Sequence, residues 1–210
     1  MRLRHIPGAE EKIAKSPYVI QDPSSEKGHW KERFGNDFPI EAEIGMGKGK
    51  FIMELARMHP DRNYVGIERY PSVLLRGLEK REQIECSNIW FLCMDAKLLP
   101  EVFEKGELTT LYLNFSDPWP KDRHAKRRLT SPEFMKIYRQ VLADGGTVEF
   151  KTDNQELFRY SLESIPAAGW EILSYTFDLH HSPLALGNVM TEYEAKFAGE
   201  GKAICKLVCR

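Results

Sequence analysis

The chain has 210 residues, of which 42% are hydrophobic, and this is enough for a single domain with one large core. Its formal net charge is only −1, which excludes a globally basic surface, so affinity for nucleic acid must come from a local concentration of Lys and Arg. The sequence contains no run of about 18 apolar residues and no N-terminal segment of the signal-peptide type. It therefore predicts a soluble, cytoplasmic protein that does not associate with membranes.

Strand and helix patterns alternate from about residue 38 onward, an order that predicts a parallel α/β sheet. Apolar runs predict strands at residues 40–44, 63–67, 89–94, 109–115, 147–150 and 202–208. Helical spacing predicts helices at residues 51–58, 71–84, 132–142 and 155–168, the third of them ended by Gly145-Gly146. Residues 1–35 are expected to form an irregular, partly flexible N-terminal extension, and residues 36–210 the functional domain.

A glycine-rich turn follows the first predicted strand. Gly45, Gly47 and Gly49 lack side chains that would keep a ligand away from the backbone. A dinucleotide fingerprint needs its third glycine at position 50, where this chain has Lys50, so a nucleoside ligand without phosphate is favoured. By itself, such a turn is equally compatible with a structural role.

Acidic residues occur at the ends of four separate predicted strands: Glu43, Glu68, Asp95 and Asp117. Each acid alone could be a solvated residue or a helix cap, but their recurrence at strand ends favours a ligand site. S-adenosylmethionine carries ribose hydroxyls, an adenine amino group and an ammonium group, all of which carboxylates bind well. The pattern therefore predicts S-adenosylmethionine as the cofactor.

A cationic cluster follows the fourth of these strands. Pro118 and Pro120 prevent the strand from continuing, which leaves Asp117 at its carboxyl end, and five Lys and Arg residues lie between Lys121 and Arg128. The cluster could be a solvated helix start, but its position favours contacts with RNA phosphates. Trp119 could stack on a base or pack the turn.

No metal site is predicted. The cysteines at positions 86, 93, 205 and 209 have neither zinc-site nor redox spacing and are expected to be reduced core residues. His180-His181 lacks further ligands at suitable spacing and is expected in a loop or at the surface.

Six motifs occur in order along nearly the whole chain: EIGMGKG, GIE at 66–68, NFSDPWPK, the basic run ending in HAKRR, FKTDN at 150–154, and TEYE at 191–194. Together they resemble the bacterial tRNA (guanine-N7)-methyltransferases, a family of class I S-adenosylmethionine-dependent enzymes. The resemblance implies a Rossmann-like, mostly parallel sheet of about seven strands, with helices on both faces and a C-terminal antiparallel strand. It also implies methyl transfer to N7 of guanine in the tRNA variable loop (nucleotide 46), giving 7-methylguanosine and S-adenosylhomocysteine.

The resemblance also assigns roles to residues, with Asp117 at the catalytic position. The implied cofactor contacts are Glu43, Gly45, Gly47, Glu68, Asp95, Ala96 and Asp117. The implied substrate contacts are Lys121, Asp153, Thr191, Glu192, Tyr193 and Glu194. The implied RNA contacts are Arg123, His124, Ala125, Lys126, Arg127 and Arg128. The implied partner is tRNA, bound by a monomer or a homodimer.

The chemistry of the acceptor agrees with these residue types. Guanine N7 carries a lone pair and no proton, so its attack on a methyl group needs alignment and carboxylates but no general base. Asp117, Asp153 and Glu194 could accept hydrogen bonds from guanine N1–H and the exocyclic amine, and so select guanine over adenine.

Two alternatives remain at this point. One is an S-adenosylmethionine transferase for a protein or small-molecule nitrogen, against which the basic run argues. The other is a non-catalytic RNA-binding module, which would not need acids at every strand end. Basic residues at positions 2, 4, 12 and 15 could form an arm that contacts tRNA, or could have no role.

Overall fold

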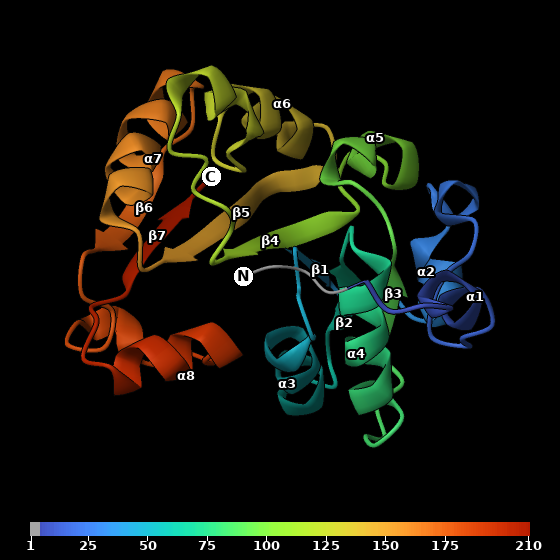
Figure 1. The fold of residues 1–210 in the computed structure, drawn as a ribbon. Helices are drawn as coiled ribbons and strands as arrows, with labels where there is room; N and C mark the ends of the chain where they lie inside the picture. Colours follow the sequence, from blue (N-terminus) through green and yellow to red (C-terminus); the bar gives the residue numbers. More distant parts are fainter. Residues whose placement is uncertain (1–4) are drawn as a thin grey trace.

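The computed structural model describes residues 5–210 and confirms the predicted, mostly parallel α/β fold. Within that range seven strands form one sheet in the order β3-β2-β1-β4-β5-β7-β6 (Figure 1). The C-terminal strand β7 runs antiparallel to both of its neighbours, and the other pairings are parallel. The strands are β1 (Ile40–Ile44), β2 (Asn63–Ile67), β3 (Ile89–Leu92), β4 (Leu108–Asn114), β5 (Leu142–Thr152), β6 (Ile172–Thr176) and β7 (Cys205–Cys209).

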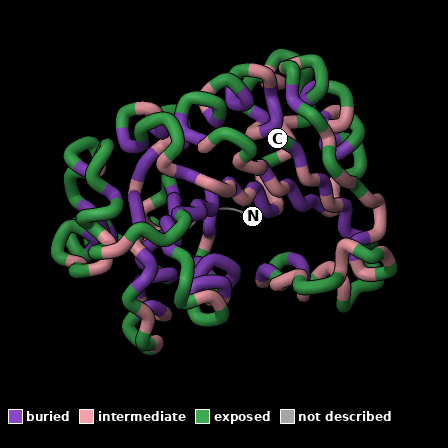
Figure 2. The backbone as a smooth tube through the Cα atoms, turned by 180° about the vertical axis from the view of Figure 1, so that it is seen from behind, coloured by how far each residue is buried: buried purple, intermediate pink, exposed green. Residues whose placement is uncertain are grey.

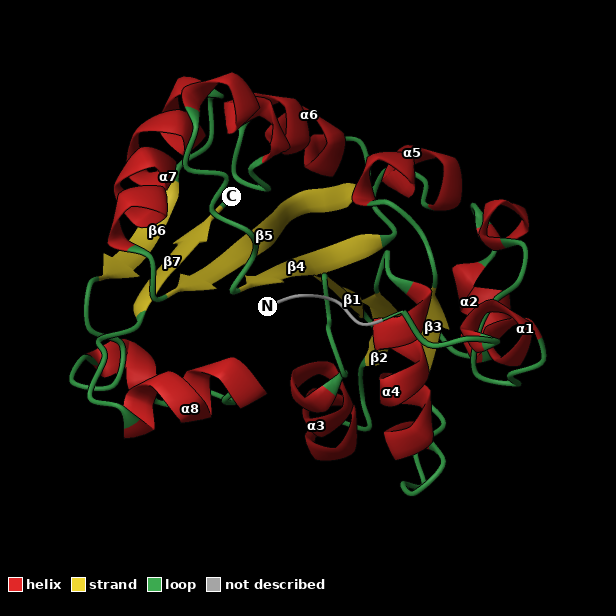
Figure 3. Cartoon of the chain, viewed as in Figure 1, coloured by secondary structure: helices red, strands yellow, loops and turns green. Residues whose placement is uncertain are grey.

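Helices cover both faces of the sheet (Figure 3). One face carries α5 (Leu99–Val102), α6 (Pro132–Arg139) and α7 (Gln155–Ala167), and the other carries α3 (Lys50–Met58), α4 (Pro71–Arg81) and α8 (Glu192–Gly199). Short 3₁₀ helices are η1 (Pro23–Glu26), η2 (Ala96–Leu98), η3 (Asp122–Arg127) and η4 (Pro183–Ala185). Among residues 5–210, no helix combines the length and apolar character needed to span a bilayer.

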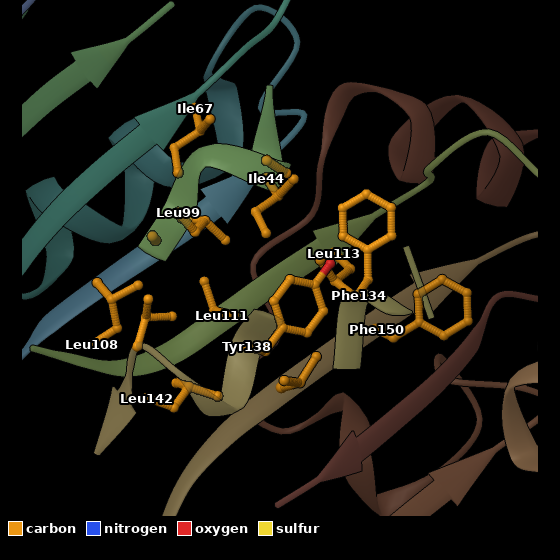
Figure 4. Packing of buried hydrophobic residues seen from close by; sticks show 14 of the residues in the cluster. Ile44, Ile67, Leu99, Leu108, Leu111, Leu113, Phe134, Tyr138, Leu142 and Phe150 are labelled. Carbon is orange, nitrogen blue, oxygen red and sulfur yellow. The ribbon is translucent and has the colours of Figure 1, made fainter. Parts of the chain in front are cut away.

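The core lies on both sides of the central strands, and every residue of β1 and β2 is buried. Helices cover both faces of these strands, so even the two glutamates of β1, Glu41 and Glu43, are buried. Buried residues gather in the middle of the molecule and exposed residues on its outside (Figure 2). Figure 4 shows Leu111 and Leu113 of β4 packed with Phe134 and Tyr138 of α6 and Phe150 of β5. A second cluster joins α3 and α4 to the opposite face.

The prediction that the first 35 residues are irregular is wrong for much of this segment. It contains α1 (Ala9–Ala14), η1 and α2 (Trp30–Phe34). Trp30 is completely buried, stacks on Phe103 with ring centroids 4.8 Å apart, and donates its indole N–H to the carbonyl of Val102 at 2.9 Å. A buried tryptophan of this size ties the segment to the main core. Arg2 and Arg4 of the suggested basic arm lie outside the described residues, and flexibility of the extension stays a prediction.

The predicted end of the helix at 132–142 is also wrong. The helix ends at Arg139, and Gly145-Gly146 lies inside β5, which begins earlier than expected. The register of β5 against β4 shifts between residues 142 and 147. A Cβ on Gly146 would lie 2.9 Å from the carbonyl oxygen of Ala143, so the glycines serve this irregularity in the strand and not a helix terminus.

Candidate active site at the carboxyl edge of the sheet

The parallel topology brings the predicted acids to one edge of the sheet. β1, β2, β4 and β5 run in the same direction, so Glu43, Glu68, Asp117 and Asp153 all lie at or just beyond their carboxyl ends. In open α/β sheets, this edge is where ligands bind.

Glu43 is buried at this edge and incompletely hydrogen-bonded. Its side chain accepts a hydrogen bond of 2.8 Å from the Asn114 amide, whereas its second carboxyl oxygen has no hydrogen-bond partner among the described residues. Burial raises the pKa of Glu43 to about 8, against the opposing effects of Asn114 and the positive charge of Lys151. A buried acid with an unused oxygen suits a ligand that brings a hydrogen-bond donor or positive charge.

The glycine turn is held by Glu68. Gly45 and Gly47 have φ of 73° and 60°, the left-handed region that glycine adopts without steric cost. Glu68, 6% exposed, accepts hydrogen bonds from the backbone N–H of Gly47 at 3.1 Å and of Tyr70 at 2.9 Å. Burial raises the pKa of Glu68, and these backbone hydrogen bonds oppose the rise. The Glu68 side chain therefore fixes the glycine turn, and its expected contact with the cofactor stays a prediction.

Asp95 and Ala96 lie beyond β3. Asp95 caps η2 by accepting from the backbone N–H of Lys97 at 3.0 Å, and its other oxygen lies 3.4 Å from Arg69. Ala96, the next residue, is buried. The cap leaves the carboxylate partly exposed, so capping and ligand binding are compatible.

The segment after β4 contains two strained residues. Phe115 and Trp119 have φ of 53° and 42°, which is unusual for aromatic residues. The N–H of Phe115 donates to the carbonyl of Lys151 at 2.8 Å, which joins this turn to β5. Asp117, inside the turn, is exposed.

Arg128 differs from the expectation that it contacts RNA. It is buried, donates to the carbonyls of Pro118 and Trp119 at 3.2 and 3.1 Å, and lies 4.2 Å from the ring centroid of Tyr160. A guanidinium with several donors is suited to holding two carbonyls at once. Arg128 therefore shapes the turn.

The remaining cations of the cluster are exposed: Lys121, Arg123, Lys126 and Arg127, called the basic segment below. His124 and Ala125 lie between them in η3 and are half-buried. Trp119 packs against this segment, with the Arg127 guanidinium 4.9 Å from its ring centroid and the His124 ring at 5.7 Å. These contacts agree with a packing role for Trp119.

The last predicted acid, Glu194, is completely buried in an ion pair. Its Oε2 lies 2.7 Å from Lys151 Nζ, and its Oε1 lies 2.9 Å from His180 Nε2 and accepts from Asn188 at 2.6 Å. Lys151 also donates to the carbonyl of Val189 at 2.9 Å. The pKa of Glu194 is lowered, because the positive charge of Lys151 and these hydrogen bonds outweigh its burial. Glu194 has no exposed surface, and its expected role in selecting guanine stays a prediction.

The other three residues of the TEYE motif have separate roles. Thr191 caps α8 by accepting a hydrogen bond from the N–H of Glu194 at 2.9 Å. Glu192 pairs with Lys80 of α4 and lies 3.5 Å from Lys48 of the glycine turn. Tyr193 is 45% exposed at the surface of α8.

Sequence reasoning missed three residues at this edge: Asn114, Phe115 and Lys151. Asn114 and Phe115 begin the NFSDPWPK motif, so proximity to Asp117 was an available signal. Lys151 lies in the FKTDN motif, but nothing in the sequence indicates that it is buried, because a lysine is normally exposed and its buried partner is 43 residues away.

Comparison with known proteins identifies the family. A family model described as "Putative methyltransferase" matches residues 37–207. The tRNA (guanine-N(7)-)-methyltransferase of Lachnoclostridium phytofermentans is 55% identical over 208 residues, which cover 99% of this chain and 97% of that protein. The chain belongs to the bacterial tRNA (guanine-N7)-methyltransferase family. It is therefore a methyltransferase, and this family implies S-adenosylmethionine as methyl donor.

Solved structures with low sequence identity share the fold of this tRNA (guanine-N7)-methyltransferase family member. The 16S rRNA methyltransferase KamB aligns with a TM-score of 0.65 at 14% identity, over 86% of this chain and 91% of that one. A variant of the 16S rRNA (adenine(1408)-N(1))-methyltransferase with cosubstrate SAM, from Catenulisporales acidiphilia, aligns with a TM-score of 0.58 at 15% identity, over 90% and 91% of the two chains. At such identities the likeness concerns the class I methyltransferase fold alone.

The buried ion pair gives a prediction about stability. We expect Lys151→Met and Glu194→Gln each to lower the free energy of unfolding by about 3–5 kcal/mol, because each leaves a buried charge unpaired. The double variant removes both charges and should be more stable than either single variant. Urea unfolding at neutral pH measures all three against the parent.

Arg57→Met is the matched control, because Arg57 forms an exposed pair with Glu54 at 2.6 Å. Arg57→Met should lower the free energy of unfolding by less than about 1 kcal/mol. If the double variant were no more stable than the less stable of the two single variants, the loss of stability in the single variants would not come from an unpaired buried charge.

Proposed function

We propose that this chain transfers the methyl group of S-adenosylmethionine to N7 of a guanine in the tRNA variable loop, nucleotide 46, and forms 7-methylguanosine and S-adenosylhomocysteine. The observation that carries the proposal is the exposed Asp117 at the tip of β4, next to the basic segment, in a chain 55% identical to a tRNA (guanine-N(7)-)-methyltransferase. We also propose that it acts in the cytoplasm. Whether it is a monomer or a homodimer stays a prediction.

The residues of the carboxyl edge fit S-adenosylmethionine. The unused oxygen of Glu43 suits a donor or positive charge, and the positive φ values of the glycine turn expose backbone to a ligand. Each carboxylate oxygen has two acceptor sites, so Glu68 can accept from ribose hydroxyls while it holds the turn. The residues proposed to hold the cofactor are Glu43, Gly45, Gly47, Glu68, Asp95, Ala96 and Asp117.

The protein's task in this reaction is alignment and charge stabilisation. The bound cofactor supplies an electrophilic methyl group on a sulfonium. Because N7 has no proton to lose, no side chain needs to act as a base. Asp117 is proposed to orient the guanine and favour the positive charge that moves onto it. Asp153, half-buried just beyond β5, is proposed to accept from guanine N1–H and the exocyclic amine.

The tRNA is proposed to bind across the basic segment through its phosphates. Lys121 and Arg123 lie nearest in sequence to Asp117, which places phosphate binding next to the reacting base. Arg128 would act indirectly, through the shape of the turn. Thr191, Glu192 and Tyr193 are proposed to line the substrate side of the site.

The direct test is incubation with methyl-labelled donor and an unmodified tRNA transcript, followed by nucleoside mass analysis. We expect 7-methylguanosine from this tRNA and none from a transcript with adenine at position 46. Asp117→Asn should lower the single-turnover rate on the order of 10²–10³-fold, because it removes one preorganised charge. The affinities for the cofactor and for tRNA are measured separately, so that binding and chemistry are not confused. A different methylated nucleoside would refute the proposed reaction, and an Asp117→Asn rate within a few-fold of the parent would refute the role of that residue.

The raised pKa of Glu43, about 8, predicts that cofactor binding depends on pH. Below pH 8 most of this carboxyl carries a proton, whereas a positively charged ligand favours the ionised form. Binding should therefore release a proton from Glu43, and up to pH 8 the affinity of the parent should rise more steeply with pH than that of Glu43→Gln. Calorimetry at pH 7 in two buffers of different ionisation enthalpy counts the protons released.

Glu43→Gln is the control for this measurement. The amino group of the cofactor contributes to the proton count with the parent and with Glu43→Gln alike. The difference between the two counts therefore gives the contribution of Glu43. Equal counts for the parent and Glu43→Gln would remove Glu43 as the linked group.

The basic segment predicts a salt-dependent affinity for tRNA. We expect Lys126→Ala with Arg127→Ala to weaken tRNA binding and to reduce the log–log salt slope by about 0.7–0.9 for each lost phosphate contact. Cofactor affinity should not change. Filter binding across a salt series measures the slope.

Lys31→Ala with Arg57→Ala removes the same charge from exposed positions in α2 and in the last turn of α3, at the opposite end of that helix from the glycine turn. Its slope should match the parent. If both double variants gave the same slope, the basic segment would not be the phosphate site.

A further inference from the structure

The strained conformation of Phe115 is fixed from two sides. Its φ of 53° is a left-handed value that costs an aromatic residue energy and persists only where the surroundings enforce it. Its backbone N–H is held by the carbonyl of Lys151 at 2.8 Å, and the preceding Asn114 is held by Glu43 at 2.8 Å. Strain that is enforced in this way calls for a functional explanation.

This conformation places the Phe115 ring against α8. The ring centroid lies 6.3 Å from that of Tyr193, with 24° between the ring planes, and 6.2 Å from that of Phe197. Phe115 is half-buried, and Tyr193 is 45% exposed. The two rings thus form a partly exposed aromatic surface, contributed by β4 and α8.

The position of this surface is set by the buried ion pair. Glu194 follows Tyr193 directly and is bonded to Lys151, whose carbonyl holds Phe115. One residue of β5 therefore fixes both rings, through its side chain on one side and its backbone on the other. Asp117 is two residues from Phe115 along the same turn.

We propose that the Phe115–Tyr193 ring pair is the surface on which the acceptor guanine stacks, with Phe115 as a base-binding residue in addition to those that the family motifs indicate. This inference rests on the proposed function. A base taken out of an RNA stack loses its stacking neighbours, and aromatic side chains replace them.

The charge change of the reaction makes this surface more favourable as methyl transfer proceeds. The bond from N7 to the methyl carbon forms while the bond from that carbon to sulfur breaks, so positive charge moves from the sulfonium to the guanine ring. Faces of aromatic rings attract cations. Stacking on Phe115 and Tyr193 therefore strengthens toward the transition state, and its loss should affect the rate of the chemical step.

The test compares Phe115→Leu and Tyr193→Leu with Phe115→Tyr and Tyr193→Phe, which keep the rings. At saturating donor and tRNA, we expect each leucine variant to lower the single-turnover rate about 5- to 150-fold, the range for loss of one base–aromatic stack. The ring-keeping variants should stay within about three-fold of the parent. Affinity for tRNA should hardly change, because phosphate contacts dominate it. Thermal unfolding verifies that each variant is folded.

Three results would overturn the inference. They are a Phe115→Leu rate within about two-fold of the parent, a Phe115→Tyr rate as low as that of Phe115→Leu, or a loss confined to cofactor affinity. The methylated nucleoside is identified in the parent reaction as well. A parent that forms no 7-methylguanosine overturns both the proposed function and this inference, whereas a parent that forms it with an unaffected Phe115→Leu variant overturns the stacking surface alone.

Discussion

The ion pair between Lys151 and Glu194 is the interaction on which the carboxyl edge of the sheet depends. Both groups are removed from water, so each needs partners in a fixed geometry, and the structure supplies them from β5, α8 and the segment between residues 180 and 189. A buried charge is stable only where its partners pair with it and hydrogen-bond to it, which restricts where Glu194 can lie. The first turn of α8 is therefore held at the edge of the sheet, where Glu192 also reaches lysines of α4 and of the glycine turn.

The charged residues at this edge fall into two groups, one buried and one exposed, and the two groups have different roles. Buried charges such as Glu68 and Arg128 bind backbone groups of neighbouring turns and set the shape of those turns. Exposed charges such as Asp117 and Arg127 remain available to ligands. A short basic run thus contains one residue that builds the turn and several that face solvent, and residue type alone does not separate them.

The turn after β4 illustrates how shape and charge combine. Two aromatic residues adopt left-handed conformations there, which cost energy and persist only because the surrounding contacts hold them. Arg128 holds the carbonyls at one end of the turn, and the backbone of Lys151 holds the other. Between these fixed ends, the turn presents an exposed carboxylate, and its Phe115 ring lies against α8. A rigid support of this kind allows a small set of side chains to keep the alignment that methyl transfer requires.

What the sequence determined was local. Glycines at 45 and 47 imply a turn with positive φ, apolar periodicity implies strands and helices, and the order of elements implies a parallel sheet whose strand ends share one edge. These features depend on neighbours in the chain, so most of them could be predicted with nearly correct bounds, except for the end of α6 and the start of β5. The motifs added the family, which the comparisons confirmed.

Only the tertiary structure decided which polar and aromatic residues are buried and what they bind. Trp30 belongs to the core because it packs on Phe103. Arg128 shapes a turn because Tyr160 and two carbonyls surround it. Glu194 is removed from solvent because it pairs with Lys151. Most of these partners are tens of residues apart. The burial of a charge depends on whether a distant group compensates it, and no local pattern in a sequence records that distance.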